Sequence, residues 1–533
     1  MRTLKKVTIL FSILLVIFTS LSGCLFDDIL PNNSDFTLIS TEIIDDEGFP
    51  SVKINYSVTG KVGFKMLNPD SKVVDYDYFY NEGVAFLKLS DYRDNIKSGK
   101  YILKTYDSDG KKLQENSFSF SSYNVEHIKN NQMYWDKNDE TYLSGIQIML
   151  LNHGKAPIYP KRLDIDIGSN IYSFDVLPTV ISPGQAGYVE CFTNIVIEED
   201  YDDFFVYLLD SDSDVIYNGI FQIDMEEMID SLNFHKGLSG PIFVPKLNFI
   251  NTYYKSLERI KESDYSVYIF DRYDDLFIDF IIEEIIDTLP FGMISYNEKS
   301  NEEKINFLSS FVQHLDYKSD RVGNDSYEYA RYPLETIFNE GGDCEDKAIL
   351  TCAILSQLGF NVSLLRFNEH MAVGVKLKED EVSDYDHYIN DYFYLETTSE
   401  GKPLGFVPND YRSTIPMDIY PVYPRPLIFH EWKDDVIAIY SNSEIGTEIK
   451  VIAIIQNYGA VEAEDLVLEA FFYLDYGLEL NNKETVVSSV KPYSKEKVLL
   501  TLSLPKKYKP WFKTRIYLNG QLVDEQQSAS KFN

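Results

Sequence analysis

The chain has 533 residues, of which 44% are hydrophobic and 14% aromatic, and its formal net charge is -35 at pH 7. This composition is that of a globular protein, and the length exceeds what one hydrophobic core supports, so three or four domains are expected. The negative charge argues against nucleic acid as a partner, because a polyanion would be repelled over most of the surface.

The first residues have the pattern of an export signal. MRTLKK is basic, VTILFSILLVIFTS is apolar, and LSGC ends at Cys24. The apolar stretch is shorter than a membrane span of about 20 residues and suits a signal peptide over 1–23. Small residues before a cysteine resemble a lipobox, which implies a lipid on Cys24 that anchors the chain to the outer face of the cell membrane. Residues 24–34 would form a polar tether. An uncleaved N-terminal anchor is the alternative, and it also places the remaining chain outside the cytoplasmic membrane.

Three segments, 35–122, 123–230 and 431–533, consist of short runs of alternating apolar and polar residues separated by turn signals. Each ends on a strand, a tight acidic or glycine turn, and a second strand: YILKTYDSDGKKLQENSFSF, FFVYLLDSDSDVIYNGIFQI and TRIYLNGQLVDEQQSASKF. We expect three all-β immunoglobulin-like sandwiches that share this closing hairpin. The stretches NHGKAP and NYGAVEAEDL, in which an N-x-G turn follows a long strand, resemble prokaryotic adhesion-related β-sandwich domains.

The acidic turns of the first two hairpins allow a second interpretation. Asp107 to Asp109 and Asp210 to Asp214 alternate aspartates in the manner of a calcium-binding loop. Neither turn is followed at the required spacing by a glutamate that could bind calcium through both oxygens, and both stand where a hairpin needs a turn. The sequence therefore favours structural turns.

The segment 231–430 changes character. Apolar residues recur at helical spacing over 274–289 and 301–315, and a third helix is expected over 344–358. Three β-rich runs follow: NVSLLRF, HMAVGVKL and YFYLETT. Helices followed by strands predict an α+β domain.

Cysteine is scarce, with Cys24, Cys191, Cys344 and Cys352 the full set. Cys352 lies on the apolar stripe of the third helix, which predicts a small core residue. Eight residues of helix separate Cys344 and Cys352 by about 12 Å, too far for a disulfide. A bridge from Cys191 to either remains open.

Cys344 stands in the first turn of its helix, where free backbone N–H groups and the helix dipole stabilise a thiolate. Asp343, Glu345 and Asp346 oppose this by like-charge repulsion, unless they turn away to cap the helix or to meet cations. An active thiol would therefore need a nearby histidine. His370 begins one predicted strand and Glu396 ends another, so the two can supply a base and a carboxylate that orients it.

These residues carry a resemblance. RYPLETIFNEGGDCEDKAILTCAILSQLGF, followed by HMAVGV and YLETT, is similar to the transglutaminase-like superfamily of papain-type cysteine folds. The resemblance covers roughly residues 290 to 415. It implies that Cys344 is the nucleophile, His370 the base and Glu396 the third member, with glutamate in place of the commoner aspartate. The backbone N–H of Cys344 is the candidate for the oxyanion site.

The resemblance implies a cell-surface lipoprotein enzyme that transfers acyl groups through a cysteine thioester, most simply a peptidase or amidase acting on extracellular protein or peptide, with no metal or cofactor required. The alternative is an inactive adhesion or assembly protein that uses the fold and its sandwiches to bind protein or glycan. A metal site built from His387, Asp384 and Asp386 is disfavoured because it lacks a second soft ligand.

Overall fold

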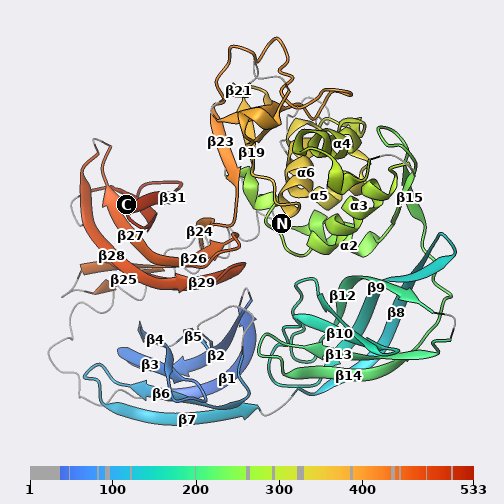
Figure 1. Cartoon of the computed structure of the whole chain (residues 1–533). Helices are drawn as coiled ribbons and strands as arrows, with labels where there is room; N and C mark the ends of the chain where they lie inside the picture. Colours follow the sequence, from blue (N-terminus) through green and yellow to red (C-terminus); the bar gives the residue numbers. More distant parts are fainter. Residues whose placement is uncertain are drawn as a thin grey trace. The chain divides into compact units, whose positions relative to one another are not determined.

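The computed structural model describes residues 36–46, 48–80, 83–90, 96–120, 123–198, 200–257, 259, 264–290, 294–320, 329–383, 388–389, 391–433, 438–442, 446–475, 477–505 and 508–532. The expected signal peptide, tether and Cys24 lie outside these ranges. The described chain is mostly β, with several antiparallel sheets and a small helical region (Figure 1). Within those ranges, no helix has the length and apolar character needed to cross a bilayer. The chain divides into two compact units, one formed by residues 1–121 with 425–533 and the other by residues 122–424.

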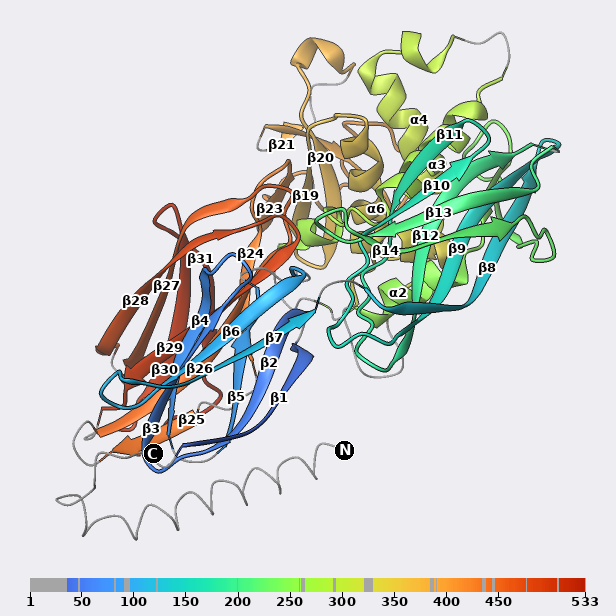
Figure 2. The same ribbon diagram turned by 90° about the horizontal axis from the view of Figure 1, so that it is seen from below.

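The first unit contains two β-sandwiches, one from each end of the chain (Figure 2). The N-terminal sandwich is built from seven strands: β1 (Thr37–Asp46), β2 (Phe49–Ser57), β3 (Lys61–Leu67), β4 (Val73–Tyr80), β5 (Gly83–Lys88), β6 (Gly99–Tyr106) and β7 (Lys112–Phe120). The C-terminal sandwich is built from β24 (Ile428–Trp432), β25 (Ala438–Asn442), β26 (Gly446–Asn457), β27 (Ala463–Tyr473), β28 (Glu479–Val490), β29 (Ser494–Ser503), β30 (Trp511–Leu518) and β31 (Gln521–Gln527).

The second unit begins with a further sandwich, whose strands are β8 (Val125–Lys137), β9 (Glu140–Asn152), β10 (Arg162–Ile167), β11 (Asn170–Asp175), β12 (Ala186–Ile197), β13 (Asp203–Leu209) and β14 (Val215–Gln222). Its core joins alternate side chains of both sheets, among them Ile146 and Ile148 from β9 and Leu163 and Ile165 from β10. Alternation with a period of two places these apolar residues on the inner faces of the two sheets.

All three sandwiches share one strand order. One four-stranded sheet runs β4-β3-β6-β7 in the first, β11-β10-β13-β14 in the second and β28-β27-β30-β31 in the third. The last two strands of each form an antiparallel hairpin, as the repeated sequence ending predicts. The acidic turns are built into these hairpins, since Asp107 Oδ1 accepts from the backbone of Asp109 and Lys111, and Asp210 Oδ1 accepts from Asp212 and Asp214. These carboxylates act as turn caps.

The N-x-G turns of the second and third sandwiches are also equivalent. Asn152 Oδ1 accepts from Gly154 N at 2.8 Å, and Asn457 Oδ1 accepts from Gly459 N at 3.0 Å. Each buried amide also donates to two backbone carbonyls, one close in sequence and one from a distant part of the same sandwich. The asparagine thus satisfies backbone groups that the turn would leave unpaired.

Within the first unit, ion pairs join the two sandwiches although their sequences lie at opposite ends of the chain. Asp46 pairs with both Lys433 and Lys497. Lys88 pairs with Glu496 at 2.8 Å, and Lys450 pairs with Asp77 at 3.0 Å. The N-terminal sandwich therefore packs with the C-terminal one rather than standing alone at the start of the chain.

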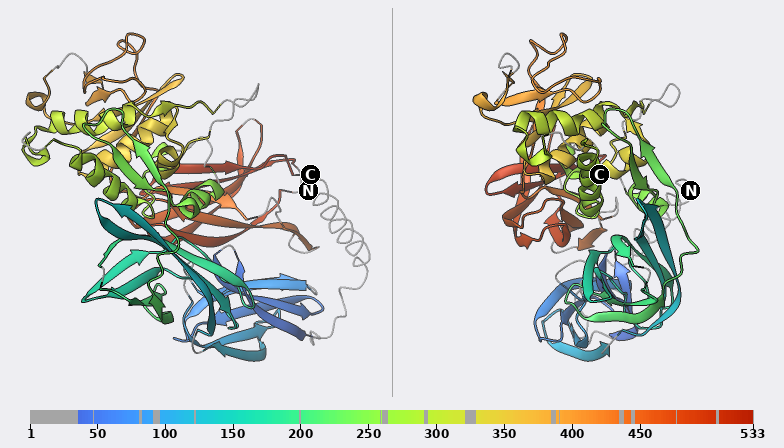
Figure 3. Two further views of the ribbon diagram at one scale, coloured as in Figure 1. Left: turned by 90° about the vertical axis from the view of Figure 1, so that its right-hand side faces the viewer. Right: turned by 45° about the vertical axis from the view of Figure 1, so that its right-hand side comes forward.

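The rest of the second unit is the helical region with its own sheet, whose helices gather in one cluster (Figure 3). Its helical elements are α2 (Asn248–Ser256), η1 (Tyr265–Tyr268), α3 (Asp275–Asp287), η2 (Tyr296–Glu298), α4 (Asn301–Gln313), α5 (Pro333–Phe338), α6 (Cys344–Gln357) and η3 (Glu379–Glu381). Its short pairs are β15 (Ser231–Phe234) with β16 (Ile242–Pro245), and β17 (Asp316–Tyr317) with β18 (Gly341–Gly342). A five-stranded sheet has the order β21 (Tyr388–Ile389), β22 (Tyr392–Leu395), β20 (His370–Val375), β19 (Val362–Phe367) and β23 (Asp418–Val422).

Helix α6 is the central element of this region. It contacts α3, α4 and α5 as well as β19 and β20, and every residue from Glu345 to Leu355 is buried. The expectation of a single apolar stripe is therefore wrong, because helices and sheet enclose α6 on all sides. The helix ends where Gly359 has φ +82°, with Gly359 N bonded to Ser356 O and Phe360 N to Leu355 O. This is a Schellman motif, which glycine favours.

Candidate active site

The turn into α6 places Cys344 at the first helical position. Gly341 has φ +153°, and a Cβ there would lie 2.1 Å from the backbone oxygen of Asp316. A Cβ on Gly342 would lie 2.4 Å from the Cβ of Asp346. The two glycines therefore allow the chain to pass close to β17 and to the first turn of α6.

The three carboxylates around Cys344 have different surroundings. Asp346 is fully buried and pairs with Arg331, and it also accepts from the backbone N–H groups of Arg331 and Asp343. Glu345 remains beside the thiol, with its Oε2 atom 3.2 Å from Cys344 Sγ. Asp343 occupies the N-cap position, and its side chain shares a hydrogen bond with Glu345. Of the three carboxylates, only Asp346 forms an ion pair, which is one of the arrangements expected from the sequence.

These surroundings affect protonation of the acids and the thiol. Burial, together with the negative charge of Glu345, raises the pKa of Cys344 well above its ordinary value. Burial and the charge of Glu345 also raise the pKa of Asp343 to about 8. A hydrogen bond from the backbone of Met371 acts in the opposite direction on the thiol. The helix N-terminus alone therefore does not hold Cys344 as a thiolate.

The Met371 bond places Cys344 against the start of β20, next to His370. His370 Nε2 lies 3.3 Å from Glu396 Oε2. Val373 pairs with Leu395 in the antiparallel β20–β22 ladder, so the start of β20 and the end of β22 lie side by side at the same end of the sheet. The structure thus pairs His370 with Glu396 and places Cys344 against the residue that follows His370.

Glu396 is buried and tightly bonded. Its Oε1 atom accepts from Thr398 N at 2.8 Å and from Thr398 Oγ1 at 2.5 Å. Burial by itself would raise the pKa of Glu396, but the hydrogen bonds from His370 and Thr398, together with the charge of His370, lower it to about 2. The carboxylate is therefore ionised and oriented toward the imidazole at any physiological pH.

Sequence reasoning missed two tyrosines at this site. Tyr394 OH donates to Glu396 Oε2 at 2.9 Å and lies 3.2 Å from His370 Nε2. The Tyr411 ring stacks on His370 with centroids 4.8 Å apart and planes at 21°. Tyr394 stands two residues before Glu396, so strand periodicity could have placed both side chains on one face. No local pattern marks Tyr411, which lies in a connecting segment before β23.

Helix α4 supports the site from behind. Gln313 Nε2 donates to Glu396 O at 2.8 Å and to Lys402 O at 2.7 Å. Lys347, fully buried in α6, donates to Gln313 O at 3.2 Å and to Leu315 O at 2.9 Å. Burial lowers the pKa of Lys347 to about 8. The C-terminal end of α4 is thus bonded both to Glu396 and to α6, the helix that carries Cys344. These shared bonds favour a fixed geometry between the two residues.

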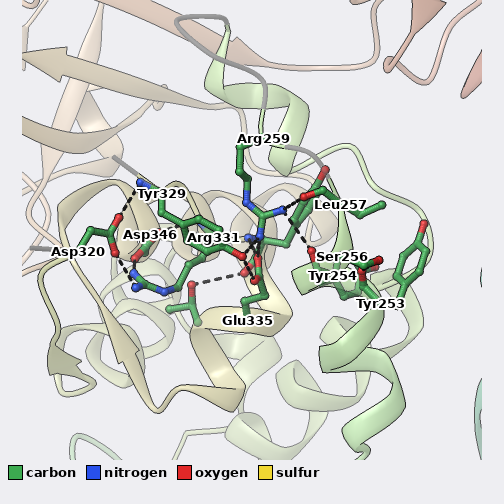
Figure 4. Close-up of polar contacts among 12 residues, drawn as sticks. Tyr253, Tyr254, Ser256, Leu257, Arg259, Asp320, Tyr329, Arg331, Glu335 and Asp346 are labelled. Atoms are coloured by element: carbon green, nitrogen blue, oxygen red, sulfur yellow. Dashed lines mark hydrogen bonds and ion pairs between the residues drawn. The ribbon is translucent and has the colours of Figure 1, made fainter. Parts of the chain in front are cut away.

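A second polar network lies beside the N-terminus of α6 (Figure 4). Arg331 binds Asp320 at 2.6 Å and also binds Asp346, while Arg259 binds Glu335 at 2.5 Å. Tyr329 OH donates to Glu335 Oε1 at 2.8 Å. The charged side chains of the RYPLETIF segment therefore have a structural role. They hold in place the part of the chain that leads to Cys344.

Cys191, Cys344 and Cys352 are all free thiols, the first and last of them buried and Cys344 half-buried, so the described residues contain no Cys191 disulfide. Cys352 is fully buried in α6, in agreement with a packing role. The disfavoured metal ligands His387, Asp384 and Asp386 lie outside the described residues.

No protein-family model matches the chain, and no curated protein matches it. Among solved structures, red sea bream transglutaminase is 10% identical with a TM-score of 0.17, over 73% of this chain and 80% of that one. A Bacteroides fragilis protein described as a beta-galactosidase is 20% identical with a TM-score of 0.14, and the match spans 19% of this chain but only 15% of that one. The YadV chaperone is 8% identical with a TM-score of 0.13, over 36% of this chain and 100% of that one. TM-scores this low support no conclusion about function, which therefore depends on the geometry of the site.

Proposed function

We propose that the region 231–430 is a transglutaminase-like cysteine acyl-transfer domain, with Cys344 as nucleophile, His370 as base and Glu396 as the residue that orients the base. The observation that supports it best is the hydrogen-bonded approach of His370 to a buried, ionised Glu396, at the strand end against which Cys344 packs. An imidazole held by a carboxylate and set beside a thiol is the arrangement of an activated nucleophile.

In the proposed reaction, His370 accepts the thiol proton as Cys344 Sγ attacks a carboxamide or peptide carbonyl carbon. The Sγ–C bond forms, the C–N bond breaks, and His370 returns the proton to the leaving amine. The resulting thioester is resolved by water, which regenerates the thiol and releases an acid, or by a second amine, which yields a new amide. Glu396 stabilises the imidazolium throughout. The backbone N–H of Cys344, in the first turn of α6, is the candidate donor to the oxyanion.

Alkylation tests the nucleophile. Near neutral pH, iodoacetamide should modify Cys344 faster than a free thiol, His370→Ala should slow the reaction, and Cys344→Ala should abolish it. Cys352→Ala is the matched control, since that buried thiol should contribute no label. A Cys344 rate no faster than that of a free cysteine would contradict the proposal. Peptides incubated with and without an amine acceptor then separate hydrolysis from cross-linking.

The second candidate is an inactive adhesion or assembly protein. The raised pKa of the Cys344 thiol favours it, because a protonated thiol is a poor nucleophile. Normal structure and partner binding without any Cys344-dependent turnover would support this alternative.

We further propose that the protein is a lipoprotein on the outer face of the cell membrane, with protein or peptide as substrate and no nucleic-acid partner. The residues before Cys24 support this. Mass spectrometry of the membrane-extracted protein should find lipid on Cys24, and Cys24→Ser should release the chain into the soluble fraction. An unmodified Cys24 would contradict it.

A further inference from the structure

One sheet face of the N-terminal sandwich is basic, although the chain as a whole has a net charge of -35. It is the outer face of the sheet β4-β3-β6-β7 (Figure 1). Phe64 in β3 and Leu103 in β6 are fully buried, so strand alternation places their neighbours on this outer face. The lysines of the face are Lys61, Lys65, Lys100, Lys104 and Lys112. Within the described ladders of this sheet, the one acid on the same face is Glu115, which pairs with Lys112 at 3.0 Å. We call this surface the basic face.

Two neighbouring rows of side chains cross all four strands of the basic face. The first row is Tyr76, Lys65, Lys104 and Glu115, and the second is Tyr78, Gly63, Tyr106 and Lys112. Because strands lie about 4.8 Å apart, each row is about 14 Å long. The surface is open to solvent, since Tyr76 is 41% exposed and Lys112 is exposed. Lysines and tyrosines therefore alternate over one continuous surface.

The register of the sheet sets two lysines against each other. Lys65 lies directly opposite Lys104 in the β3–β6 ladder. Like charges in this position are destabilising. Glu115 lies opposite Lys104 on its other side, but its carboxylate bonds to Lys112. An arrangement that lowers the stability of a sheet is expected where a ligand requires it.

The corresponding faces of the other two sandwiches have paired charges. In the second sandwich, Arg162 pairs with Asp164 at 2.9 Å. In the third, Lys513 and Arg515 both pair with Glu525, at 2.5 Å and 2.7 Å. The strand order is the same in all three sheets, so the fold does not require a face rich in lysine.

The tyrosines of the basic face are held against the sheet. The ring of Tyr78 packs onto Gly63, where a Cβ would lie 2.8 Å from it, and Lys61 Nζ lies 3.9 Å from the centroid of this ring. The rings of Tyr76 and Tyr78 meet edge to face, with centroids 5.0 Å apart. A tyrosine offers an apolar ring that can pack on the C–H groups of a sugar and a hydroxyl that can bond to a sugar hydroxyl. The neighbouring lysines add charge that suits carboxylates.

We propose that the basic face binds an acidic polysaccharide, with Lys65 and Lys104 bonded to uronate carboxylates and a sugar ring packed on Tyr76. Nucleic acid fits less well, because its dense phosphate charge would be repelled by the rest of so acidic a chain. An anionic membrane is bound by apolar side chains that enter the lipid together with basic ones. Tyr78 and Tyr106 are instead half-buried in the surface of the sheet. The proposal does not depend on acyl transfer at Cys344.

Binding of the full chain to immobilised polygalacturonate tests the proposal, with Cys344→Ala as background so that turnover plays no part. Combined Lys65→Gln and Lys104→Gln should weaken binding by at least about tenfold, because two charge-assisted contacts are lost. Tyr76→Ala should weaken it by about threefold to tenfold. Combined Lys513→Gln and Lys531→Gln is the matched control, because it changes the net charge equally but removes lysines that pair with Glu525 and Asp475. Neutral dextran should not bind.

Loss of binding can be separated from loss of structure. Since Lys65 faces Lys104, the double variant should melt at a temperature no lower than the parent. Absence of polygalacturonate binding, or equal binding by the double variant and its control, would overturn the proposal. Lysine-dependent binding to phosphatidylglycerol vesicles or to poly(dT), without binding to polygalacturonate, would also overturn it and would identify a membrane or a nucleic acid as the partner. Alkylation of Cys344 should be unchanged by the two lysine substitutions, so this result and the proposed function are tested separately.

Discussion

His370 and Glu396 face each other across two neighbouring antiparallel strands, with Nε2 of the imidazole 3.3 Å from Oε2 of the carboxylate. His370 is the first residue of β20 and Glu396 follows the last residue of β22. Because the register of the ladder fixes both backbones, the pair is positioned by a sheet rather than by a loop. The side chains of Thr398 and Tyr394 complete the support.

Replacing Glu396 by glutamine should slow alkylation of Cys344 and any peptide turnover by at least about tenfold, because the neutral amide no longer stabilises the imidazolium. Glu400→Gln is the control, since its exposed carboxylate pairs with His314 and not with His370. Equal rates for parent and Glu396→Gln would show that the carboxylate does not assist His370.

The same carboxylate should make the second unit sensitive to acid. The pKa of Glu396 is lowered to about 2 from its ordinary 4.5, so its ionisation stabilises the fold fully above about pH 4.5. That contribution, about 3 kcal/mol, is lost as the pH falls toward 2. The difference in unfolding free energy between parent and Glu396→Gln should therefore shrink on acidification. Urea unfolding at several pH values measures it, and a constant difference would contradict the prediction.

Tyr394→Phe should lower the alkylation rate by a smaller factor, about threefold to tenfold, and alter its pH profile, because a hydroxyl that touches both His370 and Glu396 is lost. Combined with Glu396→Gln, its effect should be less than additive, since both changes act on one imidazole. Tyr392→Phe removes a hydroxyl from the same strand and serves as control. An unchanged pH profile in Tyr394→Phe would show that the phenol is only packed.

Arg259→Gln should destabilise the second unit by about 3–5 kcal/mol, because Glu335 is fully buried and would lose its cation. Arg162→Gln breaks the partly exposed pair with Asp164 in the same unit and should cost about 1 kcal/mol or less. Denaturant unfolding of both variants makes the comparison. Similar small losses would mean that Tyr329 and the backbone suffice to hold the Glu335 charge.

Gly342→Ala should destabilise the same unit by about 2 kcal/mol or more, since the new methyl group would lie 2.4 Å from Asp346 Cβ and 2.6 Å from its Oδ2. It should also slow alkylation of Cys344, because Asp346 holds the first turn of α6. Gly240→Ala is the control, where the nearest atom lies 3.9 Å away. Stability equal to that of the parent would mean that the first turn of α6 shifts freely.

Much of the local structure could be read from the sequence. The helix expected over 301–315 forms as Asn301–Gln313, started by the Ser300 and Glu303 capping box. The helix expected over 344–358 forms as Cys344–Gln357, and the repeated strand-turn-strand endings form three hairpins. The motif around Cys344, His370 and Glu396 identified residues that the fold brings together. These signals are short-range, so spacing and residue type suffice to reveal them.

The sequence reading failed where long-range packing decides. Helices α2 and α5 are short and were not predicted, because tertiary contacts rather than a long apolar period stabilise them. The pairing of Asp46 with Lys433 and Lys497 joins the N-terminal and C-terminal sandwiches, and no local sequence pattern indicates it. The strand order of the five-stranded sheet likewise depends on pairings between distant segments.

The sequence by itself determined the β-rich sandwiches, the central helices and the candidate triad, because alternation, helix periodicity and motif spacing act over a few residues. Only the tertiary structure decided which partners the carboxylates around Cys344 have. Asp346 meets Arg331, whereas Asp343 and Glu345 stay beside the thiol with Asp320 nearby. Charge interactions in a buried site depend on three-dimensional distances and desolvation, which the order of residues does not reveal.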